Sequence, residues 1–292
     1  MKRSLSLIHL LLLASIALQS AAETKRAVVT VSPQSVLDGS HDYFIGLLQL
    51  ALDKANDLLE PVEIEFYGEP LTQERAFIEL ANGEALHVYW SGANQKREEV
   101  VIAIPIPLLK GLLGFRMPVI HAQSLERWRT IESLESLREF SACQGSVWPD
   151  SDILEAAGLP VERVFAFEQM YLMLHAGRCD YFPRAISEVF AELEQVNQVI
   201  PDLVAVEDLI IHYPFPMYFF VTPTQPDLAE RIREGLEKLI DSGEFDQYLQ
   251  THPATKRVFP FSQWQGARII SLSNPLLPVT AQPENPRYWI NP

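Results

Sequence analysis

Segments with strand periodicity and segments with helix periodicity alternate along the first hundred residues of the chain. Strands are expected over Ala27–Ser32, Val62–Tyr67 and Leu86–Trp90, because these runs are β-branched or alternate apolar with polar residues. Helices are expected between them, from Phe44 to Leu59 and from Thr72 to Ala81. An order in which each helix separates two strands is typical of a parallel sheet with helices on its faces. The sequence therefore predicts an α/β fold.

A second unit repeats this alternation. The further strands are expected over Phe140–Gln144, Val161–Phe167, Asp180–Phe182 and Met217–Val221, and the further helices over Ile131–Leu137, Pro149–Gly158, Met170–Gly177, Pro183–Val196 and Leu228–Ser242, the last stopped by Gly243. No Gly/Ser-rich linker separates the two units, which favours two lobes joined by crossing strands. The final stretch, Phe259–Pro292, is rich in proline and aromatic residues, and we expect it to form an ordered wrap.

The first 22 residues have the pattern of a cleaved secretory signal peptide. Lys2 and Arg3 form a basic start, Leu5–Leu18 is mostly apolar, and Ser20–Ala22 supplies small residues for cleavage. The apolar run is shorter than the roughly 18 residues that a membrane helix requires, so an uncleaved anchor is the weaker alternative. No cysteine near the cleavage site offers a point of lipid attachment. We therefore expect a protein that diffuses freely in the periplasm.

The charge of the mature chain excludes some partners. The full sequence has 23 Lys and Arg against 38 Asp and Glu, and cleavage after residue 22 removes two basic residues and no acidic one. The mature formal charge is therefore −17, from 21 basic against 38 acidic residues. Such a chain repels nucleic acid and anionic lipid at long range. The charge does not exclude an anionic ligand, because one or two arginines dominate the local electrostatic field in a site that contains little water.

The two cysteines, Cys143 and Cys179, are expected to be buried thiols. Export to the oxidising periplasm would permit a disulfide between them. However, Cys143 lies near the end of one expected strand and Cys179 near the beginning of another, positions that lie too far apart to bridge in a parallel sheet. Cysteines with apolar neighbours are also commonly buried as small hydrophobic side chains.

Four stretches together form a known pattern of helices, turns and loops. They are Arg75–Val88 (RAFIELANGEALHV), Ser91–Arg97 (SGANQKR), Gln144–Ser146 (QGS) and Leu228–Tyr248 (LAERIREGLEKLIDSGEFDQY). In these stretches the chain resembles the family 3 extracellular solute-binding proteins, the polar amino acid receptors of ABC importers, over roughly Val28 to Gln250. The helix pair of Leu228–Tyr248 is the most specific match, because helix length, stop and restart all agree. His87 departs from the pattern, since the family usually has an aspartate there.

The resemblance implies the type II periplasmic-binding fold, with two α/β lobes, each a mostly parallel sheet flanked by helices. By this likeness the first lobe holds residues 23–120 and 221–292 and the second holds residues 121–220, with crossings near Pro118–His121 and Met217–Val221. Open α/β sheets bind ligands at the carboxyl ends of their strands. The ligand is therefore expected in the cleft between the lobes.

Arg97 is the leading candidate for a ligand-binding residue. By the resemblance it closes a loop that holds a ligand carboxylate, and a guanidinium can give a carboxylate two parallel hydrogen bonds. The alternative is a surface arginine paired with Glu98 or Glu99. Ser91 and Trp90 come directly after an expected strand and would stand at the rim of the cleft, as a hydroxyl partner and an aromatic wall. Trp90 fits packing between the lobes equally well.

Arg184 is an informative departure from the family. The resemblance implies an acidic residue shortly after the Gly177–Asp180 segment, where it grips the ammonium group of an amino acid. This chain has Arg184 there, with Glu188 one turn later. If Arg184 reaches the cleft, we expect a ligand with a second acidic or carbonyl group rather than a plain cationic amino acid. An arginine at a helix start that points to water is the alternative.

Two further residues complete the candidate site. Ser146, with the backbone around it, would present N–H groups near a helix start, an arrangement that suits an anionic group. Tyr43 lies where the family places an aromatic lid, whereas Phe44 fits the core face of its helix.

The sequence lacks the signatures of common enzymes. It has no H-E-x-x-H, no cysteine–histidine metal spacing, no G-x-S-x-G and no G-x-G-x-x-G after a strand. We therefore expect no cofactor, no metal and no enzyme activity. The expected protein is a monomeric receptor for an amino acid or related carboxylate, with the membrane subunits of an ABC importer as partners and no nucleic acid. The alternatives are a receptor of the same fold read by a membrane sensor, and an enzyme resembling cyclohexadienyl dehydratases.

Overall fold

The computed structural model describes residues 27–33, 40–55 and 62–290. The strands are β1 (Ala27–Thr30), β2 (Glu63–Phe66), β3 (Val88–Gly92), β4 (Ile102–Ala103), β5 (Phe115–His121), β6 (Ala142–Gly145), β7 (Val161–Val164), β8 (Phe182–Ala185), β9 (Leu203–Ala205), β10 (Leu209–His212), β11 (Met217–Val221) and β12 (Arg268–Ser271). The helices are α2 (His41–Ala55), α3 (Gln73–Asn82), α4 (Gln95–Glu98), α5 (Leu125–Trp128), α6 (Leu134–Leu137), α7 (Pro149–Ala156), α8 (Phe167–His175), α9 (Val189–Val196), α10 (Pro226–Ser242) and α11 (Glu244–Thr251). The predicted signal peptide and the predicted helical residues Leu58 and Leu59 lie outside the described residues.

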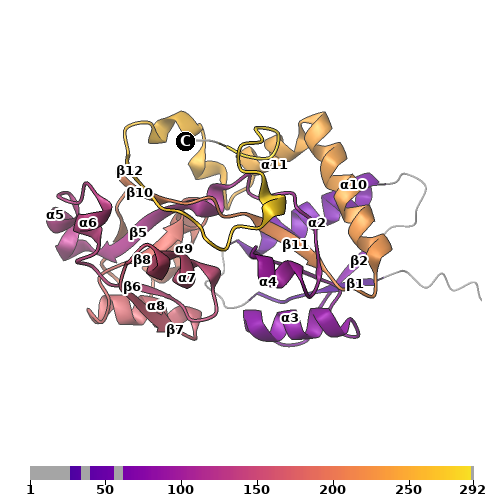
Figure 1. The fold of residues 1–292 in the computed structure, drawn as a ribbon, viewed down its shortest axis with the longest axis horizontal. Helices are drawn as coiled ribbons and strands as arrows, with labels where there is room; N and C mark the ends of the chain where they lie inside the picture. Colours follow the sequence, from indigo (N-terminus) through magenta and orange to yellow (C-terminus); the bar gives the residue numbers. More distant parts are fainter. Residues whose placement is uncertain (1–26, 34–39, 56–61, 291–292) are drawn as a thin grey trace, which may run out of the picture.

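The strands form two groups that lie at opposite ends of the molecule (Figure 1). In the first lobe, β1 pairs with β2 in parallel, and β3, β11 and β4 form an antiparallel sheet in the order β3-β11-β4. In the second lobe, β5 pairs antiparallel with β8, β9 and β10, β12 runs parallel to β10, and β6 pairs with β7 in parallel. The two-lobed α/β architecture that the sequence predicts is therefore present. Its sheets are mixed rather than mostly parallel, because β5 and β11 pair antiparallel with strands from distant parts of the chain, which local sequence patterns do not reveal.

The lobe boundaries taken from the resemblance stay a prediction. The strand pairing shows which sheet each strand near these boundaries joins. β5 and β12 both pair within the larger sheet, although residues 115–120 and 268–271 fall in segments predicted for the first lobe. β11, at the predicted second crossing, pairs along its whole length with β3 of the first lobe and at its last two residues with β4. The chain thus passes between the lobes just before β5, again between β10 and β11, and a third time between α11 and β12.

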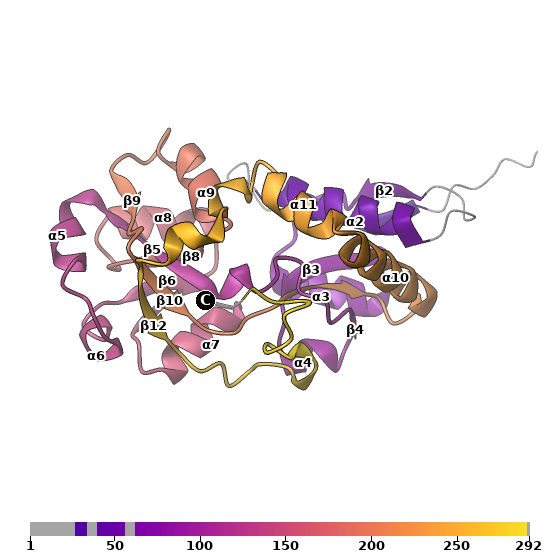
Figure 2. The same cartoon turned by 90° about the horizontal axis from the view of Figure 1, so that it is seen from above.

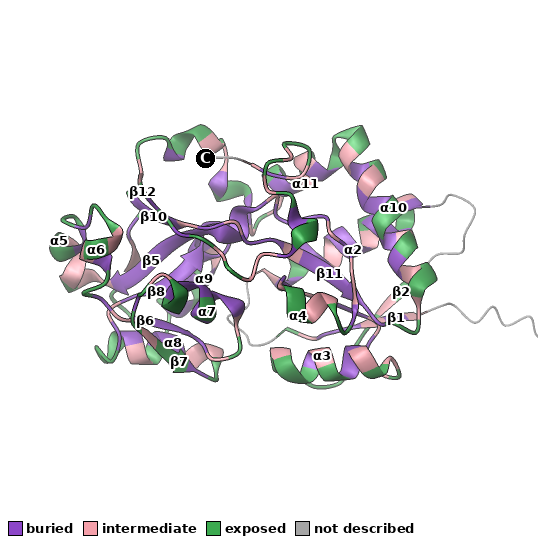
Figure 3. Cartoon of the chain, in the orientation of Figure 1, coloured by how far each residue is buried: buried purple, intermediate pink, exposed green. Residues whose placement is uncertain are grey.

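Amphipathic helices cover the sheets with their apolar faces turned inward. Figure 3 shows buried strands at the centre of each lobe and helices whose outer faces are exposed. Helix α10 illustrates the pattern, because it buries Ala229, Ile232, Leu236 and Leu239 on one face. It ends at Gly243, which adopts the left-handed conformation with φ of 78°, so the predicted helix stop is confirmed.

One predicted helix is partly wrong. The structure has strand β8 over Phe182–Ala185, and helix α9 begins only at Val189. Pro183 and Arg184 lie opposite Pro118 and Met117 in an antiparallel ladder with β5. The sequence pattern around Pro183 could not reveal this pairing, because the partner strand lies more than sixty residues earlier in the chain.

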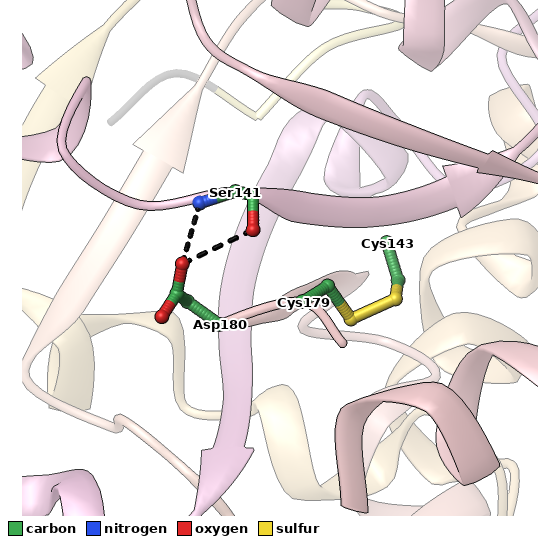
Figure 4. The surroundings of a disulfide bond; sticks show 4 residues. All are labelled: Ser141, Cys143, Cys179 and Asp180. Atoms are coloured by element: carbon green, nitrogen blue, oxygen red, sulfur yellow. Dashed lines mark hydrogen bonds between the residues drawn. A yellow bond between two sulfur atoms is a disulfide. The ribbon is translucent and has the colours of Figure 1, made fainter. Parts of the chain in front are cut away.

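The two cysteines form a disulfide, so the prediction of free thiols is wrong (Figure 4). The Cα atoms of Cys143 and Cys179 lie 5.6 Å apart, a normal spacing for the bond. The chain after α8 returns beside β6, where the backbone N–H of Cys143 donates to the carbonyl of Tyr181 at 2.8 Å. The carboxylate of Asp180 also accepts from the backbone and hydroxyl of Ser141, at 2.8 and 3.1 Å. Residues 179–181 therefore lie alongside β6, whereas the prediction placed Cys179 at a distant strand end.

The C-terminal stretch is ordered against both lobes, as predicted. We call residues 272–290 the C-terminal strap, which leaves β12 in the second lobe and runs back over the first lobe (Figure 2). It contacts the rest of the chain through several hydrogen bonds. They include those from Leu272 N to His212 O, Asn274 Nδ2 to Pro214 O, Thr280 Oγ1 to Glu98, Arg287 to Glu237 and Asp241, the Tyr288 hydroxyl to Glu237, and Ile290 N to Lys110 O. Within the described residues, none of the helices combines the length and apolar character needed to cross a lipid bilayer.

Candidate ligand-binding site

A cavity that is partly open to solvent lies between the two lobes, with about 800 Å³ of empty space when the adjoining open solvent is included. Its wall on the first lobe includes Phe44, Trp90 and Ser91, and its wall on the second lobe includes Trp148, Asp150, Phe167, Arg184, Glu188 and Glu192. Arg116, Phe215 and Met217, from the segments where the chain passes between the lobes, also line it. A concave site with apolar walls and a few polar groups is typical of small-molecule sites.

Aromatic rings form much of the wall on both sides. The ring of Phe44 stacks on Trp90, with centroids 5.2 Å apart and planes 24° apart. On the second lobe, the rings of Trp148 and Phe167 lie 6.3 Å apart. Phe44 was assigned to the core from its helical spacing, yet it also faces the cavity, because the core face of α2 continues to the cavity at the start of the helix.

Arg97 adjoins the cavity through Ser91 and is not itself part of the wall. Asn94 caps α4 and accepts the backbone N–H of Arg97 at 2.9 Å, which turns the arginine toward the end of β3. Its Nη1 donates to Ser91 Oγ at 2.7 Å and to the carbonyl of Gly92 at 2.5 Å. Its Nη2 donates to Gln73 Oε1 at 2.8 Å. A longer contact of 3.4 Å joins Nη2 to the carbonyl of residue 147 in the second lobe.

No carboxylate among the residues that the structure describes forms an ion pair with Arg97. The acceptors around its guanidinium are all neutral oxygens. Glu98, considered from the sequence as a surface partner, instead accepts from Thr280 at 2.9 Å. Burial lowers the pKa of Arg97 to about 10, which still leaves the side chain charged at neutral pH. A partly buried cation beside a cavity is therefore available to an anionic group.

Arg184 lines the cavity, but two carboxylates oppose its charge. Its Nε and Nη2 donate to the two carboxylate oxygens of Glu192 at 2.7 and 2.5 Å, and Nη2 also donates to Glu188 at 2.8 Å. The hydroxyl of Tyr171 donates to Glu192 at 2.7 Å. Burial disfavours the charged form of Arg184, yet Glu192 and Glu188 hold its pKa well above the ordinary value. The expected unopposed cation in the second lobe is thus absent, and this cluster carries a net negative charge.

A second buried ion pair at the cavity escaped the sequence analysis. Arg116, on β5, forms a salt bridge with Asp150 at the start of α7, and both side chains are nearly inaccessible. The hydroxyl of Tyr213 donates to Asp150 at 2.6 Å. Burial disfavours the charge on Arg116, but Asp150 holds its pKa above the ordinary value. The available signal was a lone arginine inside the otherwise apolar run Phe115–Ile120.

Ser146 and Tyr43 do not line this cavity. Ser146 lies in a neighbouring hollow together with Gln73 and Trp148, and its buried hydroxyl has no hydrogen-bond partner among the described residues. Tyr43 is fully buried, and its hydroxyl donates to the carbonyl of Leu108 at 2.7 Å. The structure therefore brings together Trp90, Ser91 and Arg184 at the cavity, with Arg97 behind Ser91.

No protein-family model and no curated protein matches this chain by sequence. Solved structures match its fold. An ancestral arginine-binding protein bound to arginine is 17% identical, with a TM-score of 0.57 over 77% of this chain and 96% of that one. An amino acid ABC transporter substrate-binding protein from Streptococcus pneumoniae, bound to L-arginine, is 18% identical, with a TM-score of 0.57 over 80% and 95%.

A third similar structure has a different role. It is a histidine kinase sensor domain with similarity to periplasmic binding proteins, 15% identical, with a TM-score of 0.56 over 86% of this chain and 98% of that one. Together these likenesses show the fold. The chain has the two-lobed, type II architecture of the periplasmic binding proteins, with a cavity between the lobes.

Proposed function

We propose that this protein is a periplasmic receptor that captures a small polar solute, an amino acid or a related carboxylate, for an ABC importer. The observation that carries the proposal is the cavity between the lobes, to which both lobes contribute aromatic and charged side chains. In a two-lobed protein, a solute that contacts both walls stabilises the closed arrangement, because it binds that state better than the open one.

The polar groups favour a ligand with a carboxylate. Arg97 is charged, has no carboxylate partner among the described residues, and donates to Ser91 in the cavity wall. A ligand carboxylate there would exchange neutral acceptors for a charge-assisted pair. The rings of Phe44, Trp90, Trp148 and Phe167 would hold the apolar part of the solute.

The cellular setting rests on the N-terminal sequence and on the fold. Residues 1–22 have the pattern of a signal peptide, so we propose export to the periplasm. The similar structures include amino acid ABC transporter substrate-binding proteins, which supports the membrane subunits of an importer as partners.

A second candidate is a receptor whose loaded form is read by a membrane sensor. The likeness to a histidine kinase sensor domain favours it, and the cavity would serve the same way. An enzyme on this fold has less support. The carboxylates of Asp150, Glu188 and Glu192 that line the cavity each face an arginine, an arrangement that suits a fixed network better than proton transfer.

The test is a thermal-melt screen. The mature chain from Glu23 would be unfolded and refolded to remove carried-over solute, then melted with amino acids, dicarboxylates, short peptides, polyamines and sugars. A solute at a hundred times its Kd stabilises the native state by about 2.7 kcal/mol. In a chain of this size that raises the melting temperature by several degrees.

We expect an amino acid or dicarboxylate to give the shift and Arg97→Ala to abolish it. Arg233→Ala, on the exposed face of α10, is the matched control and should leave the shift intact. A shift from sugars or polyamines alone, or one that Arg97→Ala leaves unchanged, would contradict the proposal.

A further inference from the structure

Gln73 lies in the wall of the cavity and contacts Arg97, although no sequence motif marks it. It is the first residue of α3, whose N-cap is Thr72, and it is partly exposed. It lines both the cavity between the lobes and the neighbouring hollow that contains Ser146. Gln73 therefore combines access from solvent with a place in the wall of the candidate site.

The carboxamide oxygen of Gln73 holds one side of the Arg97 guanidinium group. Gln73 Oε1 accepts from Nη2 at 2.8 Å, and Ser91 Oγ and the Gly92 carbonyl accept from Nη1. These three acceptors belong to residues of the cavity wall. The guanidinium is therefore fixed one hydrogen bond from the wall, between the end of β3 and the start of α3.

A neutral acceptor leaves the charge of Arg97 outside an ion pair. Glu192 and Asp150 show the alternative, since each forms a buried salt bridge with another arginine of the site. An amide oxygen satisfies the N–H donor, whereas a carboxylate would also oppose the positive charge. In a partly buried site such a charge attracts an anion even without a direct contact.

The charge of the cavity wall makes this difference important. The wall contains two arginines and three carboxylates, so its formal charge is −1 when His41 is counted as neutral. Because this negative charge repels an anion, the attraction of the site for a carboxylate depends on Arg97 behind the wall. A carboxylate in contact with Arg97 would remove that attraction.

We propose that Gln73 is a positioning residue, which sets the preference of the site for a carboxylate over a neutral group. It holds Arg97 behind the cavity wall and, as a neutral acceptor, leaves the positive charge to attract the solute. The inference rests on the proposed function, in which Arg97 attracts the carboxylate of the solute. It adds the residue on which that preference depends.

The test compares carboxylates with their amides. Isothermal titration of the refolded mature chain would use three matched pairs, L-arginine with L-argininamide, L-phenylalanine with L-phenylalaninamide, and L-glutamine with L-glutaminamide. The members of a pair have nearly the same shape, and only the first carries the α-carboxylate. We expect the parent chain to bind the carboxylate member of at least one pair about tenfold more tightly or better, because the amide lacks the charge that Arg97 attracts.

Gln73→Glu tests the charge, because it keeps the length of the side chain and changes the amide to a carboxylate. It should weaken binding of the carboxylate member about tenfold or more without weakening the amide member, so that the preference disappears. A purely structural role of Gln73 would instead weaken both members alike. Gln73→Met removes the acceptor and adds no charge, so it should weaken the carboxylate member only about threefold.

The matched control is Gln95→Glu, which adds the same charge at an exposed residue of α4 that lines neither the cavity nor the hollow. It should leave both affinities unchanged, because solvent screens the charge. Melting of each ligand-free variant checks its folding. Arg97→Ala should abolish binding of the carboxylate members whatever the role of Gln73, which separates this inference from the proposed function.

An equal loss for both members in Gln73→Glu, or a greater loss of the carboxylate member in Gln73→Met or Gln95→Glu, would overturn the role of Gln73 while Arg97-dependent binding left the proposed function standing. Another carboxylate found by the melt screen would be titrated in the same way against its own amide. Failure of the whole panel would count against both proposals.

Discussion

Three arginines lie at the cavity, and the protein compensates each in a different way. Arg184 is held by two glutamates, Arg116 by one aspartate, and Arg97 by neutral oxygens alone. Removing a charge from water is costly unless an opposite charge or hydrogen bonds replace the solvent. The ion pairs of Arg184 and Arg116 therefore maintain the shape of the second lobe. Arg97 has no paired carboxylate and can still attract an anion.

The Arg184 cluster gives a prediction about stability. Glu192→Gln keeps the size of the side chain but removes the charge that binds Arg184 and accepts from Tyr171, and all three groups are buried. We expect the free energy of unfolding to fall by about 2 kcal/mol, because the amide loses the charge-assisted hydrogen bonds with Arg184, and Glu188 remains the one carboxylate paired with it. Urea unfolding monitored by circular dichroism measures the change.

The matched control is Glu230→Gln, which removes one carboxylate from an exposed pair with Arg233 on α10. Exposed pairs contribute little, so its unfolding curve should overlay that of the parent chain. Equal effects of the two substitutions would show that the buried cluster does not stabilise the second lobe.

Among individual site residues, the sequence predicted those that directly follow the end of a recognisable strand. Trp90 and Ser91 were found because they follow an apolar strand, and both line the cavity. Arg116 was not found, because its importance depends on Asp150 and Tyr213, which only the tertiary fold brings to it. The same limit applies to Arg184, whose position was noticed but whose second carboxylate partner, Glu192, was not.

Among the secondary-structure elements, those with strong local patterns were predictable. Helices α2 and α10 and strand β11 stand close to their predicted ranges, since apolar spacing and a glycine stop specify them locally. Strands β9, β10 and β12 were missed, because they are short and are defined by pairing with β5 and with one another. The disulfide was missed for a related reason, since residues 179–181 reach β6 through a loop that no periodicity describes.

The disulfide between the β6 strand and the segment before β8 gives a prediction at this level. Its cysteines are 36 residues apart, and closing a loop of that size restricts the unfolded chain by about 3 to 4 kcal/mol. We expect a reductant to lower the melting temperature by several degrees. Differential scanning calorimetry with and without dithiothreitol measures the shift.

The double variant Cys143→Ala with Cys179→Ala isolates the bond from other effects of the reductant. It should melt near the reduced parent chain and should not respond to dithiothreitol. A melting temperature of the parent chain that is unchanged by reductant, in a sample shown by thiol titration to be fully reduced, would contradict a stabilising role.

The C-terminal strap joins the two lobes in addition to the chain passages before β5, before β11 and between α11 and β12. The C-terminal strap leaves β12 of the second lobe, touches the segment before β11 through Asn274, and then reaches α4 and α10 of the first lobe. Figure 2 shows this path along one side of the molecule, from one lobe to the other. Any rotation of the lobes about the cavity must therefore move or deform the strap, which makes it a further connection between them.

Trp289 fastens the end of the strap, and its loss is the last prediction. The indole is nearly buried, donates to the carbonyl of Ala281 at 2.9 Å, and packs against Gly111. Gly111 has a φ of 85°, and a Cβ there would lie 2.4 Å from the indole, so the two residues fit only as glycine and a flat ring. Trp289→Ala should lower the free energy of unfolding by about 3–5 kcal/mol, because it removes a large buried side chain.

Urea unfolding measures this loss, with Val279→Ala as the control in the same strap. Val279 is 94% exposed, so its truncation should leave stability unchanged. Because the strap contacts both lobes, Trp289→Ala should shift a single unfolding transition that tryptophan fluorescence and circular dichroism report together. If only a local transition appears and the main one stays in place, the strap is attached to the surface without stabilising the two lobes as one unit.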